Sequence, residues 1–481
     1  MEFKYKVGDK YKDGLEVLPS EKKKKILLLA DDLRMHSGIA TMSKELVFGS
    51  FHRYDWVQLG AAIQHPEQGK EIDLGEDARA ASGVENASLK LVPWRDYGNP
   101  DILRQLLMRH KPDAILHFTD PRYWKWLYEM EAEVRENCPI YFYHIWDDLP
   151  DPDYNRDFYE SCDWLGCISK QTYGIVKRVG AIEASTIKTL EDWQVSYVPH
   201  GIDPTVFKPT NVPMDVKDSI FQKKDYDFVV MWSNRNIRRK QASDVIWGFQ
   251  KFVDKLPEDK KDKVCMVMHT QPIDENGTNL FAVKDKIAKD CEIIFSDSKV
   301  SAETLNYMYN LADCMINISG NEGFGLTTAE ALMSGTPLIV NVTGGLQDQC
   351  GFKLNNKSEF LSADDYIEIG SLHNYRDWED KVIHGEWVKP VWPKVQTMVG
   401  SVPTPYIIDD KVNVDDIADA IMYWYNIPKP ERMMKGEQGR EWMINEGGLT
   451  NQNMCTQLIK GMDTAFENWK PKKRYNVYKL K

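Results

Sequence analysis

The chain has 481 residues, which is enough for two or three domains that each bury a core of their own. Hydrophobic residues make up 42% and charged residues 28% of it, as in ordinary globular proteins. The formal net charge of −12 argues against a protein coated in nucleic acid or anionic lipid, but it is compatible with a local basic patch.

No apolar run in the sequence approaches the ~20 residues that a membrane span requires, so we expect no integral membrane association. The first six residues, M-E-F-K-Y-K, lack the apolar core of a signal peptide. The eight cysteines are scattered without the spacing of a metal site, and without a leader we expect them to be reduced and mostly buried. These features predict a cytoplasmic protein and leave its oligomeric state open.

Strands and helices alternate through the first part of the chain. Residues 26–30 form an apolar run of the kind that parallel sheets bury on both faces, and a helix opens at residues 37–40. Further strands are predicted at 114–118, 140–144, 164–168 and 195–198. The pattern predicts a doubly wound α/β domain, followed at 210–225 by a linker that lacks apolar periodicity.

A second alternation of the same kind follows, with strands predicted at 228–232, 264–268, 293–295, 315–318 and 337–340. Two doubly wound domains in series, with polar groups at the carboxyl ends of their strands, imply a ligand-binding cleft between them.

Residues 319–330 read S-G-N-E-G-F-G-L-T-T-A-E and lie between the fourth of these strands and a helix. Glycines let backbone amides approach a ligand closely, and the two threonines are expected to cap the helix. A helix N-terminus after such a turn favours an anion. The carboxylates of Glu322 and Glu330 flank this site and are suited to accept hydrogen bonds from hydroxyl groups. A nucleotide sugar has this composition, because its phosphates lie between two hydroxyl-bearing groups, the sugar and the ribose.

The pattern E-G-F-G-L-x-x-x-E, followed by G-T-P at 335–337, resembles the donor-site signature of glycosyltransferase family 4. Its members are retaining enzymes of GT-B fold, an α/β architecture with two doubly wound Rossmann-like domains that face each other across a cleft. The resemblance implies that Glu322 contacts the transferred sugar and Glu330 the nucleotide ribose. It also implies a donor-binding loop between them, formed by Gly323, Phe324, Gly325, Leu326 and Thr327.

The resemblance covers residues 25–345 and 413–469 and carries the predicted domain limits. Residues 1–210 are expected to form an acceptor-side domain and residues 211–451 a nucleotide-sugar-binding domain. Residues 452–481 are expected to form a helix that crosses back to the first domain and a basic tail. Residues 351–405 depart from the family pattern and are predicted to be an insertion beside the second domain.

The loop at 234–240, N-R-N-I-R-R-K, follows the first strand of the second domain. A guanidinium fork and an ammonium point charge both suit a diphosphate. Family members place an Arg and a Lys here, which match Arg235 and Lys240, and Asn234 adjoins them. These cations would stabilise the leaving diphosphate without a metal ion. We therefore expect a nucleotide-diphosphate sugar, with UDP as its nucleotide, as donor substrate and no separate cofactor.

Four candidates lie in the first domain. Gly38 stands at the helix start where the family uses a Gly-rich loop toward the donor phosphates, although many members have two glycines there. His144 ends a strand and matches a family His that faces the sugar, and a lone His at a strand end is otherwise more often structural. His117 and Asp120, at the end of the neighbouring strand, are secondary candidates for substrate binding.

No metal is expected. The run D-D-L-P-D-P-D at 147–153 is similar to an Asp-x-Asp metal motif, but its prolines indicate a loop and GT-B enzymes need no such motif. The sequence also offers no carboxylate pair of the glycosidase type. The resemblance implies transfer on one face of the sugar, with the leaving phosphate drawing the acceptor proton and the configuration retained.

Two sequence segments bear on the acceptor. Residues 343–349 and 404–410 resemble segments of transferases encoded by large bacteriophages, and Asp348 stands where cellular members usually have Glu. Phages glycosylate hydroxylated or hydroxymethylated pyrimidines, so duplex DNA in a host cytoplasm is one predicted acceptor. Lysines at 22–25 and the basic tail at 470–481 would then follow the phosphate backbone. Aromatic residues would stack on an extruded base, for which the candidates are Tyr123, Trp124 and Trp126, although a helix core is the more common role of such residues.

Two alternatives remain open. The acceptor is also consistent with a saccharide or a glycolipid precursor, and a membrane-bound acceptor would favour a basic amphipathic patch. A UDP-sugar epimerase or a sugar-nucleotide binding protein of the same fold would need no acceptor. The combination of Glu322 and Glu330 with Arg235 and Lys240 favours transfer over both of these functions.

Overall fold

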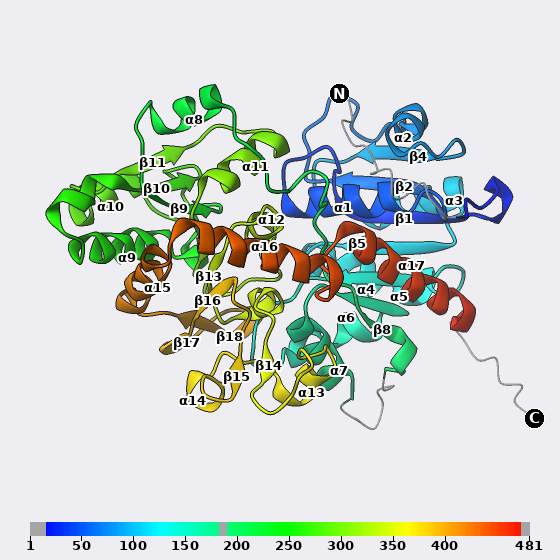
Figure 1. Cartoon of the computed structure of the whole chain (residues 1–481). Helices are drawn as coiled ribbons and strands as arrows, with labels where there is room; N and C mark the ends of the chain where they lie inside the picture. Colours follow the sequence, from blue (N-terminus) through cyan, green and yellow to red (C-terminus); the bar gives the residue numbers. More distant parts are fainter. Residues whose placement is uncertain (1–15, 182–189, 473–481) are drawn as a thin grey trace, which may run out of the picture. The chain divides into compact units, whose positions relative to one another are not determined.

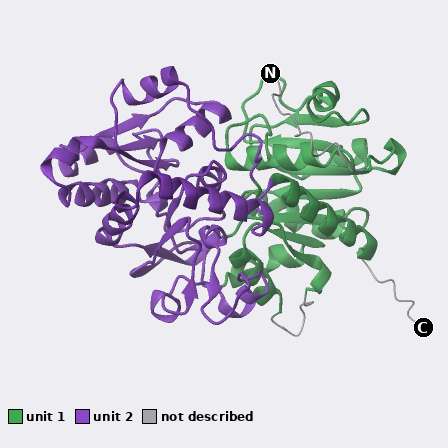
Figure 2. Ribbon diagram, in the orientation of Figure 1, with its two compact units in different colours: residues 1–146, 151–201, 451–481 green, residues 147–150, 202–450 purple. Residues whose placement is uncertain are grey.

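The computed structural model describes residues 16–181 and 190–472, which form two compact units (Figures 1 and 2). Unit 1 holds the chain up to Trp146, residues 151–201 and the chain from Asn451 onward. Unit 2 holds residues 202–450 together with the short segment 147–150. Among the described helices there is none long and apolar enough to cross a membrane.

Unit 1 is built on an eight-stranded sheet in the order β3-β4-β2-β1-β5-β6-β7-β8, parallel except for β3. Its strands are β1 (Lys24–Asp31), β2 (Tyr54–Ala61), β3 (Ile72–Asp73), β4 (Leu89–Pro93), β5 (Ala114–Phe118), β6 (Ile140–His144), β7 (Trp164–Cys167) and β8 (Val195–Tyr197). β1 lies between β2 and β5, so the strand order reverses its direction beside β1. Residues 26–30 of this central strand are apolar and buried on both faces, as their continuous run predicted.

The helices of unit 1 are α1 (Gly38–Gly49), α2 (Gly75–Ser82), α3 (Pro100–His110), α4 (Lys125–Glu129), α5 (Glu131–Val134), α6 (Arg156–Glu160), α7 (Lys170–Ala181) and α17 (Asn451–Asn468). The last of these, α17, packs against α1, β7 and β8. The hydroxyl of Tyr54 donates to Asp463 at 2.8 Å, and Arg53 pairs with the same carboxylate at 2.6 Å. The C-terminal helix is therefore held in unit 1 by buried surface and by a shared carboxylate.

Two parallel strands of this sheet, β2 and β4, escaped the sequence analysis. β2 reads Y-D-W-V-Q-L-G-A, so polar residues interrupt the apolar run that marks a buried strand. The buried Gln58 is tolerated because both ends of its amide are used: its Nε2 donates to the carbonyl of Asp31 at 2.8 Å and its Oε1 accepts from the amide of Leu33 at 3.2 Å. Tertiary contacts thus satisfy the hydrogen-bonding groups of Gln58, a residue that the local sequence pattern would not place in a buried strand.

Unit 2 contains a six-stranded parallel sheet in the order β11-β10-β9-β12-β13-β16. The strands are β9 (Phe228–Ser233), β10 (Val264–His269), β11 (Ile293–Ser296), β12 (Cys314–Asn317), β13 (Leu338–Asn341) and β16 (Val388–Val391). Relative to their order in the chain this is 3-2-1-4-5-6, the doubly wound arrangement of dinucleotide-binding domains. The strand order switches direction between β9 and β12.

The helices of unit 2 are α8 (Met214–Phe221), α9 (Ala242–Asp254), α10 (Leu280–Ile287), α11 (Ala302–Leu311), α12 (Leu326–Met333), α13 (Asp365–Ile369), α14 (Tyr375–Trp378), α15 (Val414–Asn426) and α16 (Lys429–Asn445). Two small antiparallel sheets accompany them, one of β14 (Lys353–Leu354) with β15 (Val382–Ile383) and one that is a hairpin of β17 (Val395–Ser401) with β18 (Thr404–Lys411). Large apolar side chains fill the core between β9, α9 and α15, among them Trp232, Phe249 and Trp424.

Two expectations about this unit need correction. The predicted linker at 210–225 contains helix α8 and belongs to unit 2. The predicted insertion at 351–405 contains β16, which pairs in parallel with β13 and is therefore part of the main sheet. β16 reads V-K-P-V, and a proline is compatible with the edge position that this strand occupies, but it hides the strand from a pattern search.

Candidate functional site

The candidate site in unit 2 lies where the strand order of its sheet switches direction. The loop at 234–240 follows β9, and the loop at 318–325 follows the neighbouring strand β12. In doubly wound sheets, ligands bind beside such a switch point at the carboxyl ends of the strands. The two loops are joined directly: the amide of Gly320 donates to the carbonyl of Arg239 at 2.7 Å, and Arg239 Nη1 donates to the carbonyl of Asn321 at 2.6 Å.

Lys240 and Glu322 form an ion pair at the centre of this site, with Lys240 Nζ donating to Glu322 Oε2. Both residues are buried, with 7% and 9% of their surfaces exposed. Arg239 Nη1 lies 4.0 Å from the same carboxylate oxygen. Burial alone would raise the pKa of Glu322, but the charges of Lys240 and Arg239 outweigh it and hold the pKa below its ordinary value. The carboxylate therefore stays ionised between two cations.

Two further carboxylates reach this charge cluster from the segment 147–150. Burial raises the pKa of Asp147, which also lies in the field of Arg239, Glu322 and Lys240. Burial and the neighbouring Asp147 raise the pKa of Asp148 to about 9. The segment is anchored in unit 2 because the carbonyl of Leu149 accepts from a backbone amide of β18 at 2.6 Å. Two acids whose pKa values are raised together hold a proton near neutral pH.

The glycine loop after β12 leads into α12 as the sequence predicted, but the threonines do not cap it. The helix begins at Leu326 with Gly325 as its N-cap, and the φ of +87° at Gly325 is one that glycine adopts without strain. Thr327 and Thr328 lie inside the first turn, where the Thr328 hydroxyl donates to the carbonyl of Gly325 at 2.8 Å. Phe324, the residue before the N-cap, is buried with 2% of its surface exposed.

Glu330 lies one turn further along α12 and accepts a hydrogen bond from the hydroxyl of the buried Tyr309 at 2.8 Å. Burial raises the pKa of Glu330 to about 7, and the bond from Tyr309 offsets part of that rise. The structure thus gives the two glutamates of the motif different states: Glu322 is ionised and ion-paired, and Glu330 is poised to titrate near neutral pH.

Arg235 and Asn234 lie in the loop after β9 without joining the central ion pair. The guanidinium of Arg235 is 64% exposed and pairs with Asp274, with Nε 2.9 Å from Oδ2. The amide nitrogen of Asn234 is buried and has no hydrogen-bond partner in the described part of the chain. The proposed diphosphate role of Arg235 stays a prediction, since Arg239 is the arginine closest to Glu322 here.

Two of the four candidates of unit 1 have local structural tasks. Gly38 is the first residue of α1, which Ser37 caps by accepting from the amide of Ala40 at 3.1 Å. Asp120 caps the short turn after β5 by accepting from the amide of Arg122 at 2.9 Å and pairs with its guanidinium. The helix start at Gly38 was expected from the sequence, whereas the capping role of Asp120 was not.

His117 and His144 are completely buried in the sheet of unit 1. His144 Nε2 lies 2.8 Å from the hydroxyl of Tyr159, and His117 Nδ1 lies 2.7 Å from the hydroxyl of Tyr128. Burial lowers the pKa of each histidine to about 3, so both are neutral at physiological pH. A role for His144 toward a sugar remains a prediction, and in this structure the residue is a core histidine.

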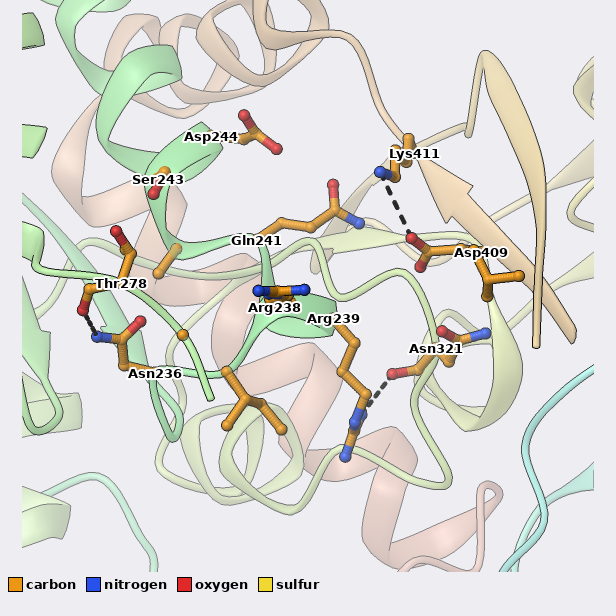
Figure 3. A pocket seen from close by; sticks show the side chains of 14 residues that line it. Asn236, Arg238, Arg239, Gln241, Ser243, Asp244, Thr278, Asn321, Asp409 and Lys411 are labelled. Atoms are coloured by element: carbon orange, nitrogen blue, oxygen red, sulfur yellow. Dashed lines mark hydrogen bonds and ion pairs between the residues drawn. The ribbon is translucent and has the colours of Figure 1, made fainter. Parts of the chain in front are cut away.

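A cavity of unit 2 lies beside the ion pair and measures about 530 Å³. Figure 3 shows its walls, which come from the loop after β9, the start of α9, the loop at 277–278 and the hairpin of β17 and β18. Lys240 and Glu322 do not line it, whereas the neighbouring Arg239 and Asn321 do. The cavity is thus adjacent to the charge cluster without being the same space.

Sequence reasoning missed several of these residues. Arg239 lies in the loop at 234–240, which the sequence analysis selected for other residues. The last three positions of that loop are all cationic, and this signal could have identified Arg239. Nothing in the local sequence indicated that Asp147 and Asp148 reach unit 2, because that contact joins distant segments. The position of β18 over the site was likewise hidden, because this strand begins inside a segment that the sequence analysis set aside as an insertion.

Comparison with known proteins places this site in a recognised family segment. Residues 217–355 match the family described as Glycosyl transferases group 1. Trehalose synthase of Thermococcus litoralis is 29% identical over 127 residues, which cover 26% of this chain and 30% of that protein. Mannosylfructose-phosphate synthase of Agrobacterium fabrum is 27% identical over 157 residues, which cover 32% of this chain and 33% of that protein. The chain therefore spans about a third of the length of these curated relatives.

Solved structures extend the likeness to nearly the whole chain. Sucrose-phosphate synthase of Thermosynechococcus elongatus superposes with a TM-score of 0.63 at 13% identity, covering 92% of this chain and 100% of that one. HepE of Anabaena, solved in complex with UDP and glucose, superposes with a TM-score of 0.58 at 11% identity and the same two coverages. At such low identity the likeness shows the fold alone. The α/β fold of GT-B class, predicted from the sequence, is confirmed.

Proposed function

We propose that the protein is a glycosyltransferase that moves a sugar from a nucleotide-diphosphate sugar, with UDP as its nucleotide, to an acceptor hydroxyl. One observation carries the proposal: Arg239 and Lys240 surround the ionised Glu322 at the switch point of unit 2, beside the glycine loop that opens α12. Cations and a helix N-terminus suit a diphosphate, and a fixed carboxylate suits the hydroxyl groups of a sugar. The match of residues 217–355 to Glycosyl transferases group 1 supports the same function.

In the proposed reaction the acceptor oxygen forms a bond to the anomeric carbon, and the bond from that carbon to the leaving phosphate oxygen breaks. The acceptor proton passes to the leaving diphosphate on the same face of the sugar, so the configuration is retained. Lys240 and Arg239 stabilise the negative charge that develops on the diphosphate, with Arg235 as a further cation. Glu322 accepts hydrogen bonds from the sugar, Glu330 accepts from the ribose, and the backbone at 323–327 positions both.

For the acceptor we propose a saccharide hydroxyl. Three of the lysines that were expected to follow the DNA backbone are buried or already paired. Lys23 is buried, Lys24 pairs with Asp113 at 3.2 Å, and Lys472 pairs with Glu131 at 3.2 Å. The rest of the basic tail, from residue 473 onward, lies outside the described residues. Trp124 is fully buried, and Tyr123, although 57% of its surface is exposed, already stacks one face of its ring on Tyr97 at 4.7 Å between ring centroids.

The test offers the protein UDP-glucose labelled in the sugar, together with glucose, maltose or duplex DNA that carries hydroxymethylcytosine. Label in a saccharide product supports the proposal, and label in DNA would replace the saccharide by the DNA acceptor. Conversion of the donor sugar to an epimer in the absence of acceptor would contradict transfer. Lys240→Gln should abolish transfer, while Arg376→Gln, an exposed residue whose side chain contacts Tyr375, serves as the matched control.

A further inference from the structure

The cavity beside the ion pair is a second polar site, and of the side chains proposed for transfer it shares Arg239 alone. Its volume of about 530 Å³ is within the range of small-molecule pockets. Its charged side chains are three cations and two carboxylates, which gives the lining a net positive charge in a chain whose net charge is −12: Arg238, Arg239, Lys411, Asp244 and Asp409. A site of this composition favours a ligand that combines an anion with hydrogen-bond donors.

The cationic side of the cavity is built from Arg238 and the first turn of α9. The Arg238 side chain is exposed and has no hydrogen bond or ion pair with any residue that the structure describes, which leaves its five donors available. α9 has 13 residues, and within the described chain no side chain caps its N-terminus. Three residues of that first turn, Ala242, Ser243 and Asp244, line the same space as the guanidinium, and the amide of Asp244 is already used by the carbonyl of Gln241. These groups suit a phosphate or a carboxylate.

The opposite side offers acceptors without donors. Gln241 is buried, with 7% of its surface exposed, and its Nε2 donates to the carbonyl of Asp410 at 3.0 Å, which fixes the orientation of the amide. Its Oε1 is left buried without a hydrogen-bond partner among the described residues, and Figure 3 shows this side chain reaching into the cavity. A buried acceptor without a partner costs free energy unless a ligand or water supplies a donor.

A second acceptor lies close by on the hairpin. Asp409 Oδ1 is buried without a partner in the described structure, while its other oxygen lies 3.6 Å from Lys411 Nζ. A Cβ atom at Gly320 would stand only 2.0 Å from Asp409 Oδ1, so this close approach requires glycine. Oδ1 is therefore packed against Gly320, and Oδ2, beside Lys411, is the oxygen that this lining carboxylate offers to a hydroxyl in the cavity.

We propose that this cavity binds an anionic sugar, with its phosphate or carboxylate at Arg238 and the start of α9 and its hydroxyls at Gln241 and Asp409. The ligand is distinct from the nucleotide-sugar donor, whose proposed groups surround Lys240 and Glu322. The site can be tested independently of the proposed transfer, since it predicts equilibrium binding and no reaction.

Isothermal titration calorimetry of the full chain with four separate probes tests the proposal: glucose 6-phosphate, glucuronate, glucose and inorganic phosphate. We expect one of the two anionic hexoses to bind at least about tenfold more tightly than either glucose or phosphate. Such a difference in affinity corresponds to the contribution of one hydrogen bond to a charged group. The better of the two identifies phosphate or carboxylate as the anion. Equal binding of all four probes, or none at millimolar concentration, would overturn the proposal.

Arg238→Gln should remove the preference for the anionic hexose and leave the fold intact, because the native guanidinium has no structural partner in the described residues. Arg376→Gln is the matched control and should bind as the wild type does. Saturating UDP should leave the affinity for the anionic hexose unchanged. Unaltered affinity in Arg238→Gln, or competitive displacement by UDP, would show that the ligand binds elsewhere and would refute the assignment.

Discussion

Unit 1 and unit 2 have parallel sheets whose strand order switches direction beside the first strand, yet the polar residues near these two points differ in kind. In unit 2 the loops after β9 and β12 hold two cations and one carboxylate, and the segment 147–150 adds two more carboxylates to this charged cluster. In unit 1 the strand ends hold separate local ion pairs, Asp32 with Arg34 and Asp120 with Arg122, beside neutral histidines that are paired with tyrosines and completely buried. The shared topology therefore fixes where a site can form, and the side chains at the strand ends decide whether its charges are joined in one cluster.

The difference gives the two units opposite responses to pH. Three histidines of unit 1 have pKa values lowered to about 3 by burial: His117, His144 and His200. In unit 2 burial raises the pKa of Glu330 to about 7 and that of Asp148 to about 9. Through these groups acid should weaken unit 1 and alkali should weaken unit 2, and the lowered pKa of Glu322 adds a loss of stability of unit 2 in acid.

The largest effect is expected on acidifying unit 1. Each of its three histidines titrates near 6.5 when unfolded and near 3 when folded, so the unfolded state binds more protons between these values. As the pH falls below 6.5, the free energy of unfolding should decrease with a slope that reaches about 4 kcal/mol per pH unit midway between these two values. Hydrogen exchange read separately in the peptides of each unit measures this.

His144→Gln is the variant that sharpens the acid test, because it removes one titrating group and keeps a polar side chain near Tyr159. The acid slope of unit 1 should fall by about a third. A slope equal to that of the wild type would mean that His144 is already charged in the folded state, which would contradict its burial and favour a role for it at a polar surface.

The second effect concerns the ion pair of unit 2. Replacing Glu322 by Ala should abolish transfer and also destabilise unit 2 by about 3–5 kcal/mol, because it leaves the buried Lys240 without its partner. This loss of stability would not be expected for an exposed loop carboxylate, and it follows from the burial of Glu322. A sugar-transfer assay and a urea titration of the same variant measure the two losses.

Glu322→Gln separates these two roles. The amide keeps the shape and an acceptor for Lys240, so the stability should return in part, while transfer should stay impaired if the carboxylate charge serves the reaction. A variant with wild-type transfer would remove Glu322 from the proposed machinery. The matched control is Asp285→Asn, which neutralises an exposed carboxylate on α10 and should change neither transfer nor stability.

The third effect is the alkaline counterpart in unit 2. Glu330 titrates near 7 in the folded protein and near 4.5 when unfolded, so the folded state binds more protons between these values and loses stability as the pH rises through them. Glu330→Gln cannot ionise and keeps an acceptor for Tyr309. The free energy of unfolding of this variant should equal that of the wild type near pH 4.5 and exceed it by about 3 kcal/mol at pH 8. Urea titrations at several pH values measure this difference, and a difference independent of pH would contradict the raised pKa.

Some strands could be predicted from the sequence and others could not, for physical reasons that differ from strand to strand. Continuous apolar runs such as those of β1, β9 and β10 were predicted within two residues, because a strand buried on both faces is marked by its own composition. β2 and β16 were missed because a buried glutamine and an edge proline break that pattern, and only tertiary contacts make them strands. The loops holding Lys240 and Glu322 were found from motif spacing. Their ion pair was not, because it joins residues 82 positions apart.

The smallest effect is expected from removing metal ions. If Lys240, Arg239 and Arg235 stabilise the leaving diphosphate, transfer should continue at an unchanged rate after dialysis against EDTA. The segment 147–150 is the place where this prediction can fail, because Asp147 and Asp148 lie near Glu322 in unit 2. A divalent cation there would lower the raised pKa values of both acids and would make the rate depend on added magnesium or manganese. Strict metal dependence that Asp148→Asn abolishes would therefore assign the diphosphate to a metal and leave the cations of the loop after β9 with a supporting role.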